Sequence, residues 1–105
     1  MGVRRLWFFG DYAAESPVWS DLGMVSLEDL PVSDAARAEA HRWVQRWDEL
    51  ATADMAAGAY ANKMSSVPSE PVRPEQWASL ERDGRAVCKR LQKELGEEWH
   101  LEWAG

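Results

Sequence analysis

Few residues in this chain are of the types that carry out catalysis or bind metal ions. The sequence contains two histidines and one cysteine. His100 is separated by single residues from Glu98 and Glu102, a spacing that places the three side chains on one face of a β-strand. A row of carboxylate, imidazole and carboxylate can hold a metal ion or transfer a proton. Alternating polar residues on the solvent side of a strand give the same pattern, so a small enzyme or metal-dependent domain is kept as an alternative.

The other reactive groups favour structural roles. His41 lies beside the apolar stripe of a predicted helix, where a solvated imidazole is typical. Cys88 falls within a helical pattern and is interpreted as a small buried side chain. As the single cysteine, it excludes an intrachain disulfide and a cysteine zinc cluster. The sequence lacks serine-nucleophile, phosphate-loop and paired-histidine motifs. We therefore predict that the chain is not an enzyme and uses no cofactor or metal.

The charge balance limits the kinds of partner. The 105 residues include 12 lysines and arginines against 18 aspartates and glutamates, which gives a net charge of −6. Because nucleic acid requires clustered basic residues, the composition argues against binding to it and favours a basic protein partner. No apolar run is long enough to span a membrane, and the run that follows Arg5 ends at Asp11, too early for a secretion signal. The expected location is the cytoplasm.

Periodicity and capping residues predict the elements of the first half of the chain. Residues 3–9 form an apolar stretch typical of a strand. Ser26 begins a single helical turn. A long helix starts at Ser33, a good N-cap, and its apolar stripe continues past Leu50. Gly58 is the position where this helix is expected to weaken.

The second half of the chain is predicted as a loop, a helix and a strand. The loop covers residues 62–73, which are rich in proline. Pro74 begins the second helix and Gly96 ends it. Gly84 lies inside the apolar stripe of this helix, which predicts close approach of the other helix or the sheet. Residues 98–103 alternate between polar and apolar and predict a half-buried strand.

These elements predict a single domain over residues 1–105 with an α+β fold. A small sheet containing the N- and C-terminal strands is expected to pack against two antiparallel helices. Because a two-stranded sheet is only marginally stable, either part of residues 17–25 adds a strand or a second copy of the chain extends the sheet. The apolar residues at 6–9 do not alternate, which predicts that both faces of the first strand are covered at that end.

Seven tryptophans are the most unusual feature of the composition. Trp19 differs from the rest because it lies in a segment with several acidic residues. Two interpretations remain for it: an aromatic anchor of an interface whose charged neighbours select the partner, or a residue that pins the segment to the core. The others are assigned to the core: Trp7, Trp43, Trp47, Trp77, Trp99 and Trp103.

Several stretches of the sequence resemble a group of bacterial proteins. They are Leu-Trp-Phe-Phe-Gly-Asp-Tyr at residues 6–12, Pro-Val-Trp at 17–19, Leu-Glu-Asp-Leu-Pro-Val-Ser at 27–33, and the ending at 94–101. In these residues the chain is similar to small, arginine-rich and lysine-poor bacterial proteins that are immunity-like or uncharacterised. The similarity covers most of the chain outside residues 52–73. It implies a protein that neutralises a co-produced toxin by blocking the toxin's active site, without catalytic residues of its own.

The leading hypothesis is therefore an immunity-type inhibitor that covers a basic toxin. Acidic groups would mimic an anionic substrate or pair with basic residues around the toxin's active site. A structural homodimer that pairs its edge strands is a further alternative. The predicted contact residues lie in the acidic and aromatic connection between the first strand and the first helix: Asp11, Tyr12, Glu15, Trp19, Asp21, Glu28 and Asp29.

Overall fold

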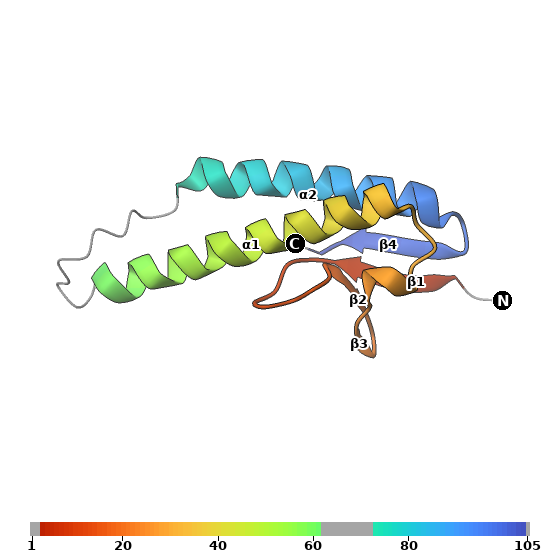
Figure 1. Cartoon of the computed structure of the whole chain (residues 1–105), viewed down its shortest axis with the longest axis horizontal. Helices are drawn as coiled ribbons and strands as arrows, with labels where there is room; N and C mark the ends of the chain where they lie inside the picture. Colours follow the sequence, from red (N-terminus) through yellow and green to blue (C-terminus); the bar gives the residue numbers. More distant parts are fainter. Residues whose placement is uncertain (1–2, 62–72, 105) are drawn as a thin grey trace.

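The computed structural model describes residues 3–61 and 73–104 (Figure 1). Within these residues the chain forms four strands, one short 3-10 helix and two long helices. In chain order they are β1 (Arg4–Phe8), β2 (Val18–Ser20), β3 (Gly23–Met24), η1 (Leu27–Asp29), α1 (Asp34–Ala61), α2 (Pro74–Leu95) and β4 (Trp99–Trp103). The α+β class predicted from the sequence is confirmed.

The strands form one mixed sheet in the order β3-β2-β1-β4. The terminal strands β1 and β4 lie side by side and run parallel, with Arg4 opposite Trp99 and Phe8 opposite Trp103. The other neighbours are antiparallel. Residues 17–25 therefore extend the sheet with the β2–β3 hairpin, which was the first of the two expected ways to enlarge it.

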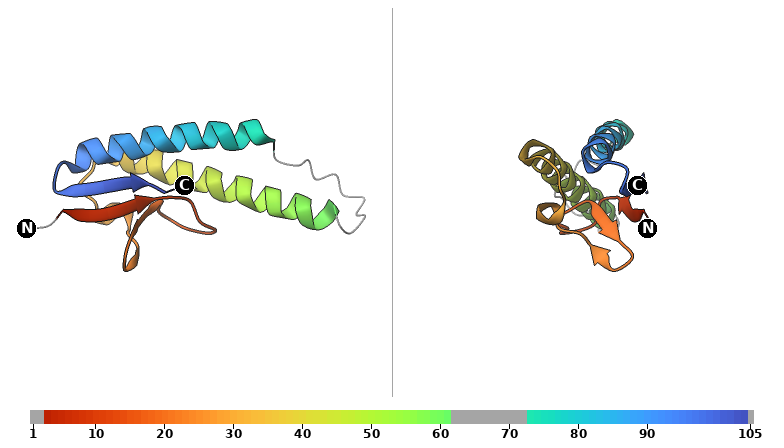
Figure 2. Two further views of the ribbon diagram at one scale, coloured as in Figure 1. Left: turned by 180° about the vertical axis from the view of Figure 1, so that it is seen from behind. Right: turned by 90° about the vertical axis from the view of Figure 1, so that its right-hand side faces the viewer.

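Both helices pack on the same face of the sheet, antiparallel to each other (Figure 2). Their ends are where the capping residues predict them. The Ser33 hydroxyl accepts a hydrogen bond from the Ala36 N–H at 3.2 Å, and α2 starts at Pro74. Gly96 follows α2 with a φ of 84°, in the left-handed region that favours glycine. Helix α1 continues through Gly58 to Ala61. The predicted loop at 62–73 lies outside the described residues apart from Arg73.

The core lies between the helices and the inner face of the sheet. Phe8 is fully buried at its centre, with ring centroids 4.9 Å from Trp43 and 5.7 Å from Trp103. Gly84 allows the two tryptophan rings to reach α2, because a Cβ atom at this position would lie 2.7 Å from the Trp43 ring and 2.8 Å from the Trp103 ring. The close approach predicted at Gly84 is confirmed. The thiol of Cys88 is also buried, and burial raises its pKa to about 11 despite the opposing charge of Arg85.

The outer face of the sheet corrects one prediction. Along β1, Leu6 and Phe8 point inward and are buried, whereas Trp7 is half-buried on the opposite face, as is Phe9 just beyond the strand. Trp7 is absent from the core cluster, so its assignment to the core was wrong. The expectation that both faces of β1 are covered fails for the same physical reason: both helices lie on one side of the sheet, and no other element of the described residues forms a second layer on the other side.

The exposed edge of β4 is partly occupied by a side chain from α2. The Leu101 N–H donates to Oε1 of Gln92 at 2.6 Å, and Nε2 of Gln92 donates to the Trp99 carbonyl at 2.9 Å. Backbone groups that face away from β1 are thereby satisfied within the chain. An edge blocked in this way offers fewer groups for pairing with another strand, as a homodimer through β4 would require.

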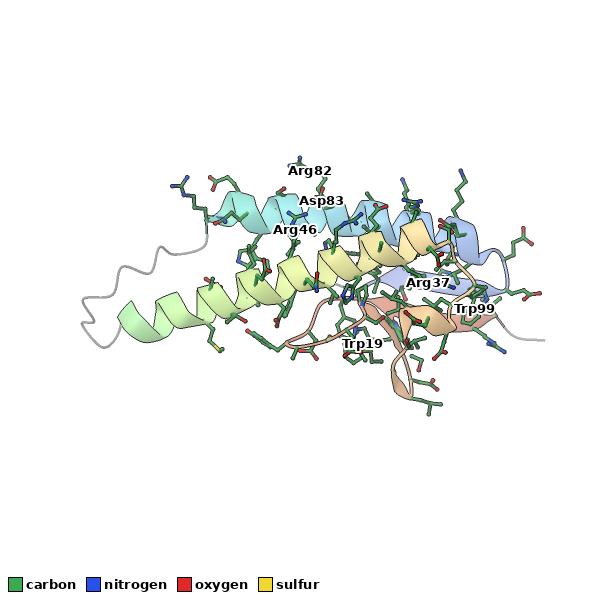
Figure 3. All side chains as sticks on the ribbon, in the orientation of Figure 1. Trp19, Arg37, Arg46, Arg82, Asp83 and Trp99 are labelled. Carbon is green, nitrogen blue, oxygen red and sulfur yellow. The ribbon has the colours of Figure 1, made fainter. Side chains whose placement is uncertain are left out.

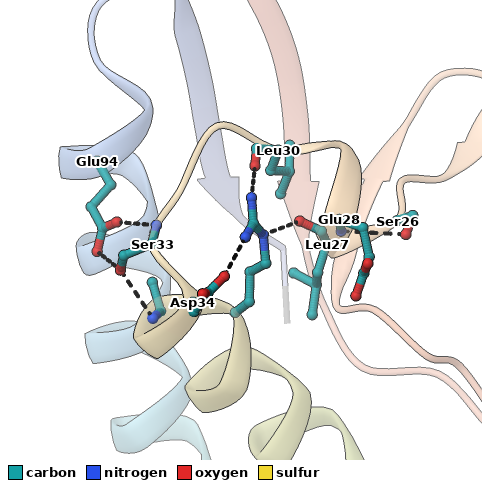
Figure 4. Close-up of polar contacts among 9 residues, drawn as sticks. Ser26, Leu27, Glu28, Leu30, Ser33, Asp34 and Glu94 are labelled. Atoms are coloured by element: carbon teal, nitrogen blue, oxygen red, sulfur yellow. Dashed lines mark hydrogen bonds and ion pairs between the residues drawn. The ribbon is translucent and has the colours of Figure 1, made fainter.

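Glu94 fastens the start of α1 to the end of α2. Its carboxylate accepts hydrogen bonds from the Ser33 N–H at 2.6 Å and the Ser33 hydroxyl at 3.1 Å (Figure 4). Arg90 lies 3.3 Å from the same carboxylate. The two bonds from Ser33, followed by the Arg90 guanidinium, hold the pKa of Glu94 below its ordinary value.

We expect the stabilising effect of Glu94 to depend on pH. Because the folded state lowers its pKa, the carboxylate stabilises the protein fully above the unfolded value of about 4.3 and loses this effect as the pH falls through the folded value. The Glu94→Gln variant should therefore unfold at lower urea concentration than the parent at pH 7, and the difference should shrink at pH 3. Exposed Glu97, changed to glutamine, is the matched control. If Glu94→Gln lowered the urea concentration of unfolding by the same amount at pH 7 and at pH 3, the charge of the Glu94 carboxylate would not be the source of its stabilising effect.

Candidate functional site

Six of the seven predicted contact residues lie on three segments on the side of the molecule away from α2, and the seventh, Trp19, lies in β2 (Figure 1). The first is the loop between β1 and β2, the second is the tip of the β2–β3 hairpin, and the third is η1. At the hairpin tip, Asp21 is exposed next to Leu22, whose side chain is 95% exposed. We use the name acidic surface for the exposed members of the predicted set: Asp11, Tyr12, Glu15, Asp21, Glu28 and Asp29.

The β1–β2 loop is held against α1. The Tyr12 ring meets the Trp47 ring edge-on, with centroids 5.3 Å apart, and the Ala13 N–H donates to the Asp48 carboxylate at 2.8 Å. Gly10 permits this approach, since a Cβ atom there would fall 2.3 Å from the Trp47 ring. The loop is thus fixed through contacts at its tip, which places Asp11 and Tyr12 beside the middle of α1.

Trp19 lies in β2 and points away from the core. Its ring stacks on Phe9 at 4.8 Å with an angle of 9° between the planes, and its Nε1–H donates to the Phe9 carbonyl at 3.1 Å. The side chain is half-buried on the outer face of the sheet (Figure 3). The interpretation that Trp19 pins an irregular segment to the core was wrong, because the residue belongs to a strand and packs on its uncovered face.

A groove of about 470 Å³ runs between the β1–β2 loop, the hairpin, η1 and α1. Its lining includes Glu15 of the loop, Met24 of the hairpin and Glu28 of η1. His41 of α1 also lines it, with Nδ1 3.3 Å from the Glu15 carbonyl oxygen. The other acidic members of the predicted set lie outside this groove.

Arg37 also lines the groove, although the helical pattern places it toward solvent. Its guanidinium donates to the Leu27 carbonyl at 3.0 Å, to the Leu30 carbonyl at 2.9 Å and to the Asp34 carboxylate at 2.7 Å (Figure 4). The side chain thereby fastens η1 to the start of α1. Because its charge already has a partner in Asp34, it compensates little of the charge of Glu15 and Glu28.

The acidic surface is not neutralised by the chain's own arginines. Among the described residues, its five carboxylates form no ion pair, whereas five carboxylates of α1 and α2 each pair with an arginine. A carboxylate that is exposed and unpaired keeps its full charge available to a partner. The charge of these five carboxylates is therefore available to a partner, although seven further described carboxylates on the helices and at or before β4 also form no ion pair. The five paired carboxylates belong to Asp34, Glu39, Glu81, Asp83 and Glu94.

Comparison with known families decides what kind of protein presents this surface. The sequence model of the Serratia CdiI immunity protein-like family matches residues 4–105. The chain belongs to this family. The immunity-like resemblance noted in the sequence is confirmed, and the match spans every element from β1 to β4. No curated protein matches the chain at a significant level.

In this CdiI-like immunity protein, the residues of the alternative enzymatic site lie on the sheet and next to it. His100 and Glu102 are exposed on the outer face of β4, opposite Arg5 and Trp7, and Glu98 is exposed just before the strand. Over the described ranges, no three His, Cys, Asp or Glu side chains lie close enough together to hold a metal ion. Neither of the described helices is long and apolar enough to cross a membrane.

Sequence reasoning missed part of the exposed aromatic surface of this immunity-like protein. Trp7 lies directly opposite Trp19, and Trp19 lies opposite Met24. The signal was present in the unbroken run from Leu6 to Phe9, because a strand with apolar side chains on both faces places one set outside any one-sided core. What the run does not indicate is which of the two faces the helices cover.

Proposed function

We propose that the protein is a non-enzymatic inhibitor that binds a cognate toxin and covers the toxin's active site. Membership of an immunity protein-like family supports the role, and the unpaired carboxylates of the acidic surface support the place of contact. A toxin with a basic active site, such as one that acts on an anionic substrate, is the partner that fits this charge. We expect the encounter to occur in the cytoplasm.

The proposed mechanism is occlusion by charge and shape together. Exposed carboxylates attract the basic partner from a distance, which raises the rate of association. In the complex, Glu15 and Glu28 at the groove would receive basic side chains of the toxin, and Asp21 and Leu22 at the hairpin tip would add a charged and an apolar contact. Tyr12 and Trp19 would supply buried aromatic area, which is typical of residues that carry binding energy.

The first test of this proposal is to find the partner. The tagged protein is used to capture proteins from its native host, with washes at low and moderate salt, and bound proteins are identified by mass spectrometry. A single stoichiometric partner that is basic, and toxic when expressed without the inhibitor, is the expected result. Absence of any partner above background would count against the inhibitor and favour the enzyme or homodimer alternatives.

Charge reversal then tests the acidic surface. Replacing Asp11, Glu15 and Asp21 by lysine shifts the net charge from −6 to zero. Because exposed interface charges act mainly through the association rate, we expect association with the captured toxin to slow about tenfold or more at low salt. The difference should narrow at high salt, where exposed charges are screened. Stopped-flow measurements at two salt concentrations provide the check.

The matched control is a variant with the same net charge of zero, in which three acidic residues outside the acidic surface are replaced by lysine. Glu49, Asp54 and Glu97 are also exposed acidic residues, on α1 and in the turn before β4. Their triple lysine variant should associate with the toxin substantially faster than the acidic-surface variant. Equal rates would show that total charge, rather than this surface, controls binding, and the assignment of the site would be withdrawn.

A further inference from the structure

The outer face of the sheet carries a straight row of side chains across all four strands. In the order of the strands, the residues are Met24, Trp19, Trp7 and Glu102, each directly opposite the next. Residues paired in this way point to the same face of a sheet. We call these four residues the outer-face row. Met24 is 43% exposed, Glu102 is exposed, and the two tryptophans are half-buried.

This row is continuous with the proposed toxin-binding surface. Met24 stands at one end of the row and also lines the groove that contains Glu15 and Glu28. The groove and the outer-face row therefore share Met24 at the β3 edge of the sheet. The helices lie on the other side of the sheet, and the views agree that no described element covers this side.

The chain itself shows how its tryptophans bind cations. The guanidinium of Arg4 lies 4.9 Å from the centre of the Trp99 ring, and that of Arg85 lies 5.1 Å from the centre of the Trp103 ring. Among the described residues, no cation stacks in this way on Trp7 or Trp19. Indole rings attract guanidinium groups through the negative charge of their faces. One face of Trp19 is covered by Phe9, whereas Trp7 has neither an aromatic nor a cationic stacking partner among the described residues.

We propose that the outer-face row is part of the toxin interface and receives an arginine side chain of the basic partner, stacked on Trp7 and paired with Glu102. This inference rests on the proposed function. Glu102 supplies the carboxylate, because its strand register places it beside Trp7 on the same face. Arg5 and His100 form the next pair along the strands, so the arginine approaches from the Glu102 side, away from Arg5.

The size of the face favours a toxin over a second copy of the chain. Four strands spaced about 4.8 Å apart, with a rise of about 3.3 Å for each of at most five residues, give a face of roughly 300 Å². A stable interface needs about 800 Å² on each partner. The outer face is therefore too small to hold a dimer by itself, but it suffices as an extension of an interface that already includes the acidic surface.

A peptide titration tests the arginine site without requiring the toxin. The indole N–H resonances of the ¹⁵N-labelled protein are recorded while triarginine amide or trilysine amide is added, and Trp7 is assigned from its leucine variant. We expect the Trp7 resonance to move with triarginine and to respond about threefold more weakly to trilysine, which lacks a planar cation. Equal responses to both peptides, or no response of Trp7, would overturn the proposal.

Two variants make the titration specific. Glu102→Gln should weaken the response of Trp7 to triarginine about threefold, a size typical of an exposed charged contact. Glu97→Gln removes the same charge from an exposed position outside the row and should leave the response unchanged. If both variants weaken it equally, the peptide senses only the net charge and the proposal fails. A Trp7 resonance that moves with protein concentration alone would identify a second copy as the occupant and would likewise overturn it.

The captured toxin separates this inference from the proposed function. Trp7→Leu keeps an apolar side chain on the outer face but removes the aromatic ring, so we expect about threefold weaker toxin binding with an unchanged circular dichroism spectrum. Tight binding that does not depend on Trp7 would reject the arginine site while the inhibitor role stands. A specific triarginine response in a protein that binds no toxin would support the arginine site and reject the inhibitor role.

Discussion

Replacing Phe8 by alanine should remove a large part of the stability of this domain. Phe8 is fully buried and contacts the rings of Trp43 and Trp103. Truncating a buried phenylalanine costs about 3–5 kcal/mol, because apolar contact is lost and the cavity fills only in part. Domains of this size have total stabilities of about 5–15 kcal/mol. Urea unfolding of the Phe8→Ala variant should show this loss, with a melting temperature lower by about 12 °C or more.

Leu22 offers the control for this prediction. Its side chain is also large and apolar, but it is 95% exposed at the hairpin tip. The Leu22→Ala variant should stay within about 0.5 kcal/mol of the parent. Similar losses for the two variants would mean that Phe8 does not occupy the centre of the core.

Replacing Gly84 by alanine should destabilise the protein, although helix propensity alone predicts the opposite. In an exposed helix position this change gains about 1 kcal/mol. Here the new Cβ atom would lie 2.7 Å from the Trp43 ring and 2.8 Å from the Trp103 ring. Trp43 cannot turn aside freely, because its Nε1–H donates to the Leu80 carbonyl at 2.8 Å. Overpacking costs about 1–3 kcal/mol, which the propensity gain offsets in part, so we expect a net loss of up to about 2 kcal/mol in urea unfolding.

The sign of the change in the free energy of unfolding distinguishes helix propensity from the packing of the tryptophan rings. Ala86 is exposed on the same helix, and its replacement by glycine should cost about 1 kcal/mol through propensity alone. Propensity alone thus predicts a gain in stability at Gly84 and a loss at Ala86, whereas the packing of the two tryptophans against Gly84 turns the expected gain there into a loss. A more stable Gly84→Ala variant would show that the rings do not press against α2.

Much of the fold could be predicted from local signals. Ser33, Pro74 and Gly96 mark helix ends through the hydrogen bonds and backbone angles that each residue type favours. The alternation in residues 99–103 identifies β4 correctly, with Leu101 buried and His100 exposed. Such signals depend on neighbours in the sequence and therefore need no knowledge of the rest of the structure.

The features that could not be predicted depend on contacts between distant segments. Nothing near Trp7 indicates on which side of β1 the helices pack, so a ring on the outer face looks the same in the sequence as a ring in the core. Arg37 looks like a solvent-facing helical residue, but it binds the carbonyl groups of Leu27 and Leu30, which are brought to it by the turn before α1. The groove likewise depends on the loop that carries Glu15 and on η1, which carries Glu28, coming to lie opposite α1 in the folded chain.

The parallel pairing of β1 with β4 has a consequence for how the protein is made. Arg4 and Trp99 are neighbours in the sheet but stand almost at opposite ends of the chain. Pairing of this kind closes a loop that contains the hairpin and both helices, and contacts of high sequence separation slow folding. During synthesis, β1 must wait for its partner until both helices have been added. The helices and the hairpin can form earlier, but the β1–β4 pairing, and with it the complete sheet, requires that β4 has been synthesised.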